Sequence, residues 1–292
     1  MVDFCHITPT KYLNEFAAGR SHHLLLAHLV EEDPAYREWY QELSRDPDTT
    51  IIMDNGGFEC FKAGKPMYPS DKLIEMGTQC GADYIVMSDY PGEHWTKTVE
   101  AAEYTAEEIR DAGFGTFFVP QSEIGDLHGL QESFFWAADS DLVDYIGVSI
   151  LAVPNAYGVE KNNKLQRFLS RWMFLNTIAE DGILDEKKIH LLGMVDGPNE
   201  ILLLENFLHQ IDTWDSSAAV WAGFCGIEFD QSPTGLINGK NEIEVNFAFD
   251  SATDEQMEMA RENVQYIDDL LELSDQPFTS DQLLSVFDGG KE

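Results

Sequence analysis

Three aspartates, Asp54, Asp89 and Asp230, each follow a short run of apolar, β-prone residues and precede residues typical of turns. If the runs are parallel strands of one barrel, the three carboxylates meet at its carboxyl-terminal face, where barrel enzymes build their sites. Such a set is suited to catalysis or to binding magnesium or manganese. It needs a purpose of this kind, because an unpaired charge is costly to bury. The alternative is that each aspartate only caps a helix or forms a turn.

The elements that would position these side chains alternate along the chain. Apolar runs separated by helical stretches predict an α/β fold with a parallel sheet. The predicted strands span 2–7, 24–30, 49–54, 83–89, 116–121, 144–150, 189–194 and 225–230, which makes eight. Eight strands close a (β/α)8 TIM barrel.

Three further stretches have clear helical patterns, which are 96–113, 197–211 and 253–275. The last of them follows a strand-like stretch over 241–249. No internal repeat, low-complexity tract or long linker marks a boundary. We therefore expect one domain over 1–292, with an extra strand and a C-terminal helix over 241–275.

The composition limits the class of protein. Of the 292 residues, 43% are hydrophobic, which is enough for a sizeable core. The sequence has no apolar window of about 18 residues and no basic-then-apolar N-terminus, so we expect a cytoplasmic protein with no membrane partner. The four cysteines have neither the spacing of zinc ligands nor that of a disulfide framework.

The charge balance is strongly acidic, with 53 acidic and 18 basic residues and a net charge of −35 spread along the chain. Dispersed acidity of this kind is typical of halophilic proteins, and ordinary acidic solubility is the alternative. It does not exclude a nucleic-acid partner, because in 1 M salt the Debye length is only about 3 Å.

Six segments at predicted strand ends carry a family resemblance; they are MDNGGFE (53–59), SDYPGE (88–93), VPQSE (119–123), YIGVSILA (145–152), HLLGMV (190–195) and FDQSPTG (229–235). In the same order they resemble the segments DSGGFQ, FDECTP, IVQGG, IGGLAVGE, YLMGVG and FDCVLPTR of the tRNA-guanine transglycosylase superfamily. The tRNA enzymes carry a zinc-binding subdomain with a CxCxxC cluster after the last of these, whereas this sequence has no cysteine after Asp230. The chain is therefore most similar to the compact DpdA-like DNA 7-deazaguanine transglycosylases of viruses and archaea, and we expect a barrel without the zinc-binding subdomain. With the halophilic composition, this similarity suggests a viral protein that acts in the host cytoplasm.

The resemblance implies that guanine in DNA is replaced by 7-cyano-7-deazaguanine, without a cofactor. Asp230 would be the nucleophile of a covalent aspartyl–nucleic acid intermediate, and Asp54 the general acid and base. Asp89 would accept hydrogen bonds from the guanine-like base, and Gln121 would donate to its carbonyl oxygen. The other residues that the resemblance places around the base are Gly147, Ser149, Phe58, Leu192 and Gly193. For Phe58 and Leu192 the alternative is ordinary core packing.

Basic side chains near the predicted carboxyl-terminal rim are candidates for phosphate contacts. The segment 161–171 places four of them on approximately one helical face, which are Lys161, Lys164, Arg167 and Arg171. Lys62 and Lys65 follow the Asp54 loop, and Lys240 follows the Asp230 loop. The alternative is a solvated face or local ion pairs. The expected partners are thus DNA and a free 7-deazaguanine base, with a homodimer as a candidate assembly.

Three other functions stay open on the sequence. The chain could be a tRNA-guanine transglycosylase with another docking mode, or a non-catalytic partner subunit that binds nucleic acid. The presence of Asp54, Asp89 and Asp230 together weighs against a pure scaffold, which needs no such set. The third alternative is a metal-dependent barrel hydrolase, in which the three carboxylates would hold the ion.

Overall fold

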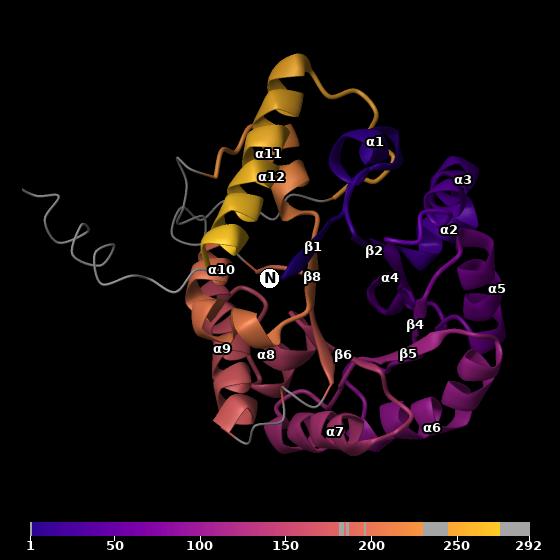
Figure 1. Cartoon of the computed structure of the whole chain (residues 1–292). Coiled ribbons are helices and arrows are strands. Elements are labelled where there is room, and N and C mark those ends of the chain that lie inside the picture. Colours follow the sequence, from indigo (N-terminus) through magenta and orange to yellow (C-terminus); the bar gives the residue numbers. More distant parts are fainter. Residues whose placement is uncertain (1, 181–183, 185–186, 196, 230–244, 275–292) are drawn as a thin grey trace, which may run out of the picture.

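The central feature of the computed structural model is an eight-stranded, all-parallel sheet in the order β1-β8-β7-β6-β5-β4-β3-β2. The structure describes residues 2–180, 184, 187–195, 197–229 and 245–274. The strands at the two ends of this order, β1 and β2, lie beside each other, so the sheet is a nearly closed barrel. Helices alternate with the strands and form a ring outside them (Figure 1). The predicted (β/α)8 TIM barrel is therefore confirmed.

The strands are short, and they are β1 Asp3–His6, β2 His22–Leu25, β3 Thr50–Met53, β4 Tyr84–Val86, β5 Gly115–Phe118, β6 Tyr145–Ser149, β7 Lys188–Leu192 and β8 Thr213–Ser216. The first helices are α1 Leu13–Phe16, α2 Ala27–Glu32, α3 Pro34–Leu43, α4 Gly57–Ala63, α5 Ser70–Cys80 and α6 Trp95–Asp111. They are followed by α7 Leu127–Asp139, α8 Ala152–Ala156, α9 Lys164–Glu180, α10 Pro198–Leu204, α11 Ala218–Phe224 and α12 Asp254–Ser274. The described residues also form the 3-10 helices η1 Thr10–Tyr12 and η3 Glu205–Gln210. No helix in these ranges is long and apolar enough to cross a membrane.

The outer helices cover the barrel with one apolar face each. In α6, for example, Val99, Ala102, Ala106 and Ile109 are buried at the three- and four-residue spacing of a helix, and the other faces are acidic. The predicted helices over 96–113 and 253–275 are confirmed as α6 and α12. The one predicted over 197–211 is divided into α10 and the 3-10 helix η3.

An aspartate stands immediately before each of the strands β4, β6 and β8, and these are Asp83, Asp144 and Asp212. Each carboxylate accepts a hydrogen bond of 2.7–2.8 Å from the backbone N–H of the second residue of the preceding strand, namely Ile51, Thr116 and Ile189. The three aspartates thus fix the register of three strand pairs at the amino-terminal end of the barrel.

One predicted strand and part of another are wrong. The run 24–30 ends as a strand at Leu25, and its second half belongs to α2. The run 225–230 is not the eighth strand, because β8 is Thr213–Ser216 and residues 225–229 follow α11 without strand structure. Its apolar character serves packing instead, since Phe229 is buried and its N–H donates to Asn263 of α12 (2.8 Å). The described part of the run 241–249, residues 245–249, also forms no strand.

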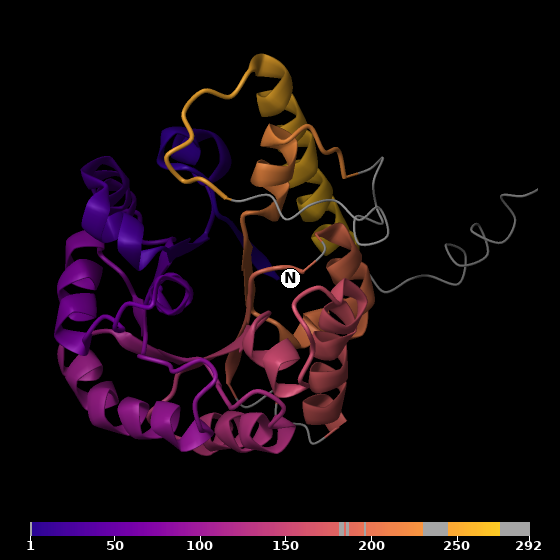
Figure 2. The ribbon, with the colours of Figure 1, turned by 180° about the vertical axis from the view of Figure 1, so that it is seen from behind.

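The C-terminal helix α12 packs against α11 outside the barrel, as Figure 2 shows from behind. Its Asp268 carboxylate is tied to the N-terminal region by hydrogen bonds from His6 Nε2 (3.1 Å) and from both terminal nitrogens of Arg20 (2.9 and 2.6 Å). Burial raises the pKa of Asp268, but these donors and their charge outweigh burial and hold the pKa at about 2.

Asp268→Asn should lower the free energy of unfolding at pH 7 by about 2 kcal/mol, because the folded-state pKa of about 2 lies below the unfolded value of about 3.9. A depressed pKa stabilises the fold where the carboxylate is ionised, so the contribution is lost as the pH falls from about 4 through about 2. Urea unfolding at pH 7 and pH 2.5 measures the difference, with the exposed Asp269→Asn as the matched control. A deficit that stays the same at both pH values would contradict this origin.

Candidate functional site

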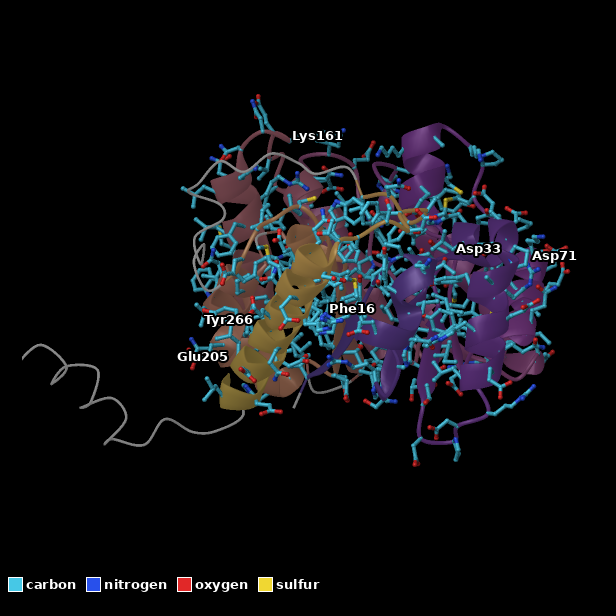
Figure 3. All side chains as sticks on the ribbon, turned by 90° about the horizontal axis from the view of Figure 1, so that it is seen from above. Phe16, Asp33, Asp71, Lys161, Glu205 and Tyr266 are labelled. Carbon is cyan, nitrogen blue, oxygen red and sulfur yellow. The ribbon has the colours of Figure 1, made fainter. Side chains whose placement is uncertain are left out.

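A cavity of about 330 Å³ opens at the carboxyl-terminal ends of the strands. Its size is that of a small-molecule site. The apolar wall includes Ile7, Leu24, Leu26, Val119, Leu192 and Met194. The polar groups include Asp54, Asn55, Asp89, Gln121, Ser149 and Asp215. Barrel enzymes carry their active sites on this face. In the side view of Figure 3 it is the end at which Lys161 projects, opposite Glu205.

Asp89 is held in this cavity by two amide side chains. Asn55 Nδ2 donates to Asp89 Oδ1 (2.8 Å) and to the carbonyl oxygen of Met87 (2.7 Å), and Gln121 Nε2 donates to Asp89 Oδ2. Asn55 is itself fixed, because its Oδ1 accepts the N–H of Gly57 (2.7 Å). Burial raises the pKa of Asp89 to about 6, and the two amide donors limit the rise. Asp89 therefore changes its charge just below neutral pH.

Asp54 directly follows β3, and its Oδ2 accepts the N–H of Gly56 (3.0 Å). Gly56 has the left-handed φ of +65°, which lets the chain turn back over the carboxylate. Burial raises the pKa of Asp54 well above its usual range, and the nearby charges of Glu59, Asp89 and Asp215 raise it further. A carboxyl group in this setting holds its proton and can serve as a general acid.

Besides Asp54, Asp89 and Glu59, the cavity is lined by the carboxylate of Asp215 on β8, which was not predicted from the sequence. Its side chain is almost buried, and its Oδ1 accepts hydrogen bonds from His190 Nε2 (3.0 Å) and from the N–H of Gly193 (3.1 Å). Oδ2 accepts no hydrogen bond from any residue that the structure describes, and Asp215 lines the cavity. Asp230, which was predicted in this position from the sequence, lies outside the described residues, as does Lys240. What the structure contradicts is the placing of Asp230 at the end of the eighth strand.

The residues predicted around the base divide into two groups. Ser149, Leu192 and Gly193 line the cavity, and the Ser149 hydroxyl also accepts the N–H of Leu151 (3.1 Å) before α8. Gly147 does not line it. A Cβ on Gly147 would meet Phe117 at 2.5 Å and Leu192 at 2.8 Å, so this glycine makes room for the packed barrel interior. Phe58 lies in α4, but its side chain is not among those described.

Arg171 is not available to a phosphate, which corrects the sequence prediction. Its guanidinium is fully buried and pairs with Glu200, with Nη2 and Oε1 2.6 Å apart. It also donates to the backbone carbonyl oxygens of Val148 (3.1 Å), Leu192 (3.1 Å) and Gly193 (2.7 Å). Arg171 thus holds the ends of β6 and β7 together from outside the barrel.

The other predicted basic residues lie closer to solvent. Lys161 is exposed, and Arg167 is half-buried, with Nη1 donating to the carbonyl oxygen of Lys161 (3.4 Å). Because α9 begins at Lys164, residues 161–171 do not form one continuous helix. Lys62 in α4 and Lys65 just after it are exposed, and α4 lies inside the ring of outer helices in Figure 1. These exposed cations thus follow β3 and β6, whose carboxyl-terminal ends border the cavity.

Neither a search for metal-binding side chains nor a comparison with known proteins identifies a further function for these residues. Among the residues that the structure describes, no group of three or more His, Cys, Asp or Glu side chains is arranged to hold a metal ion. Comparison of the sequence with protein-family models and with curated proteins finds no match.

Proposed function

We propose that the chain exchanges a base in DNA, replacing guanine by a 7-deazaguanine through a covalent aspartyl intermediate. The observation that carries the proposal is the meeting of Asp54, Asp89 and Asp215 in one cavity, each with a different set of neighbours. The ordered resemblance to the transglycosylase superfamily, described from the sequence, supports the same chemistry.

Asp215 takes the role of the nucleophile in this proposal, in place of Asp230. Its Oδ2 attacks the anomeric carbon, the new carbon–oxygen bond forms, and the carbon–nitrogen bond to guanine breaks. The electrons of the broken bond leave with guanine. The incoming base then attacks the same carbon and releases the Asp215 carboxylate, so two inversions retain the configuration.

Asp54 supplies and removes the proton. Because its pKa is raised, the carboxyl group holds a proton that it can give to the departing guanine. The carboxylate that results accepts the proton of the incoming 7-deazaguanine, which restores the starting state. Each turnover therefore needs no outside acid or base.

Asp89 recognises the base. An ionised carboxylate only accepts hydrogen bonds, and the edge of a guanine-like base presents several donors. Asn55 and Gln121 orient the carboxylate, and Gln121 has a second amide hydrogen with which to approach the base. The apolar residues Leu192 and Val119 of the wall suit the faces of a planar ring.

Binding of free 7-cyano-7-deazaguanine should weaken as the pH falls through about 6, the pKa of Asp89. Above this pH the carboxylate accepts the donors of the base, and below it the neutral carboxyl group cannot do so fully, so Kd should rise about tenfold between pH 7 and pH 5. Isothermal titration calorimetry at high salt measures this, with Asp89→Asn expected to bind weakly at both values. The exposed Asp71→Asn is the control, and an unchanged Kd in the wild-type protein would argue against this role.

DNA is the proposed nucleic acid. The exposed cations Lys161, Lys62 and Lys65 near the entrance can contact phosphates without reading sequence. The target nucleotide must leave the stack before its anomeric carbon can reach the cavity.

The experiment is an exchange assay at high salt, with labelled guanine in DNA and separately in tRNA, plus 7-cyano-7-deazaguanine. Release of label from DNA supports the proposal, and release from tRNA alone would keep the chemistry but change the substrate. No release, together with an EDTA-sensitive hydrolysis, would favour the metal-dependent barrel hydrolase. No activity of either kind, with DNA still bound, would favour a non-catalytic subunit.

A further inference from the structure

A chain of hydrogen bonds runs through the barrel interior to Asp215. His190 Nε2 lies 3.0 Å from Asp215 Oδ1, and His190 Nδ1 lies 2.6 Å from Thr213 Oγ1. Thr213 Oγ1 lies in turn 3.1 Å from the hydroxyl of Tyr145. His190 is fully buried, and its ring packs edge-on against Phe117, with centroids 5.5 Å apart. Neither the family resemblance nor the proposed mechanism assigns a role to this series of hydrogen bonds.

The order of donors along this chain follows from its two ends. At one end the Asp215 carboxylate only accepts hydrogen bonds, which requires a proton on His190 Nε2, and at the other end the Tyr145 hydroxyl donates to Thr213. Its proton points at Thr213 Oγ1, so the Thr213 hydroxyl donates to His190 Nδ1. With Nδ1 accepting from Thr213, the ring proton of His190 sits on Nε2 and points at Asp215 Oδ1. Thr213 and His190, the two inner members of this series of hydrogen bonds, thus each donate one hydrogen bond and accept another.

The same oxygen of Asp215 is held from a second side. The N–H of Gly193 donates to Oδ1 at 3.1 Å, and Gly193 has a left-handed φ of +70° that aims this N–H at the carboxylate. The carbonyl oxygen of Gly193 accepts from the buried Arg171 (2.7 Å) and from the indole of Trp214 (2.8 Å). The peptide that carries Gly193 therefore has little freedom to move.

We propose that His190 is a positioning residue for Asp215, whose Nε2–H, together with Gly193, fixes Oδ1 and leaves Oδ2 as the oxygen that attacks the anomeric carbon. This inference rests on the proposed function. It assigns a role to a histidine that makes no contact with the base. Two donors on one oxygen stop the carboxylate from rotating about its Cβ–Cγ bond, and a misplaced reacting atom can cost about 100-fold in rate.

The first test reads the tautomer of His190 and does not depend on activity. In ¹⁵N-labelled protein, long-range proton–nitrogen correlation spectra should show a neutral imidazole protonated at Nε2, assigned by the loss of its signals in His190→Gln. In Thr213→Val the Nδ1 shift should move toward that of an imidazole nitrogen without a donor. Protonation at Nδ1 in the wild-type protein would overturn the inference.

The second test separates positioning from binding and from folding. His190→Phe keeps an aromatic ring beside Phe117 but removes both hydrogen bonds, so the single-turnover rate of covalent adduct formation should fall about 100-fold. The Kd for free 7-cyano-7-deazaguanine should stay within about threefold, because Asp89 recognises the base. His190→Gln can still donate to Asp215 and accept from Thr213, and it should regain about tenfold of the lost rate.

An adduct rate in His190→Phe equal to that of the wild-type protein would overturn the inference, as would equal rates in His190→Phe and His190→Gln. If the wild-type protein forms no adduct at all, the proposed function fails. The spectra would then still decide whether His190 donates to Asp215, so the two failures can be told apart.

Discussion

Asp215→Ala should lower the rate of base exchange by about 10⁴-fold or more, whereas Asp230→Ala should keep the rate within about tenfold of the wild type. The reason is position. Asp215 lies on β8 inside the cavity that Asp54 and Asp89 also line, and without its carboxylate no covalent intermediate can form. The exchange assay with labelled DNA measures both rates under the same conditions.

Two controls keep this result interpretable. Both variants should bind free 7-cyano-7-deazaguanine within about threefold of the wild type, because Asp89, Asn55 and Gln121 remain in place. Both should also keep the thermal transition of a folded barrel. If Asp230→Ala is inactive and Asp215→Ala is active, the assignment of the nucleophile is wrong and the resemblance had placed it correctly.

Arg171→Met should lower the free energy of unfolding by about 3–5 kcal/mol, because it removes the cation that pairs with a fully buried Glu200. Three backbone carbonyl oxygens at the ends of β6 and β7 lose a donor as well. Guanidinium chloride unfolding at high salt measures the change. The half-buried Arg167→Met, on the same helix, is the matched control and should cost less than about 1 kcal/mol.

The double variant Arg171→Met, Glu200→Met sharpens this prediction. A buried ion pair can often be replaced by apolar side chains at small cost, so the second substitution should restore part of the lost stability. Arg171→Met with normal stability, but with weakened DNA binding, would instead return Arg171 to the phosphate-binding role that the sequence suggested.

The barrel could be predicted because most of its strands are apolar on both faces. The runs around Ile51, Ile85 and Ile146 lie between the barrel interior and the outer helices, so their residue types alone indicate buried parallel strands. The eighth strand does not show this apolar pattern, because its inward residues are polar. Thr213 and Asp215 both form hydrogen bonds with His190.

A signal for the eighth strand was nevertheless present in the sequence. Asp83 and Asp144 are the first residues of the predicted strands 83–89 and 144–150, and Asp212 stands in the corresponding position before Thr213–Ser216. These aspartates fix strand register, so their repetition marks strand beginnings more reliably than the apolar run at 225–230 did. A strand beginning at Thr213 would have placed Asp215, rather than Asp230, at the barrel mouth.

Other parts of the site could not be predicted from the sequence, because they depend on contacts between distant elements. Asn55 bridges from the β3 loop to Asp89 and Met87, and nothing in the local sequence indicates that bridge. Arg171 shares its helical spacing with Lys164 and Arg167, but spacing alone does not show which side of α9 faces the barrel. By contrast, Asp54 and Asp89 could be placed correctly in the cavity because each follows a strand that the sequence shows clearly.

The most direct measurement is the capture and mapping of the covalent intermediate. The wild-type protein is incubated with guanine-containing DNA without an incoming base, denatured, and cleaved after glutamate, which separates 206–228 from the peptide that contains Asp230. The account predicts a DNA adduct on the peptide 206–228, located at Asp215 by fragmentation. An adduct on Asp230, or no adduct while guanine is still released, would contradict it.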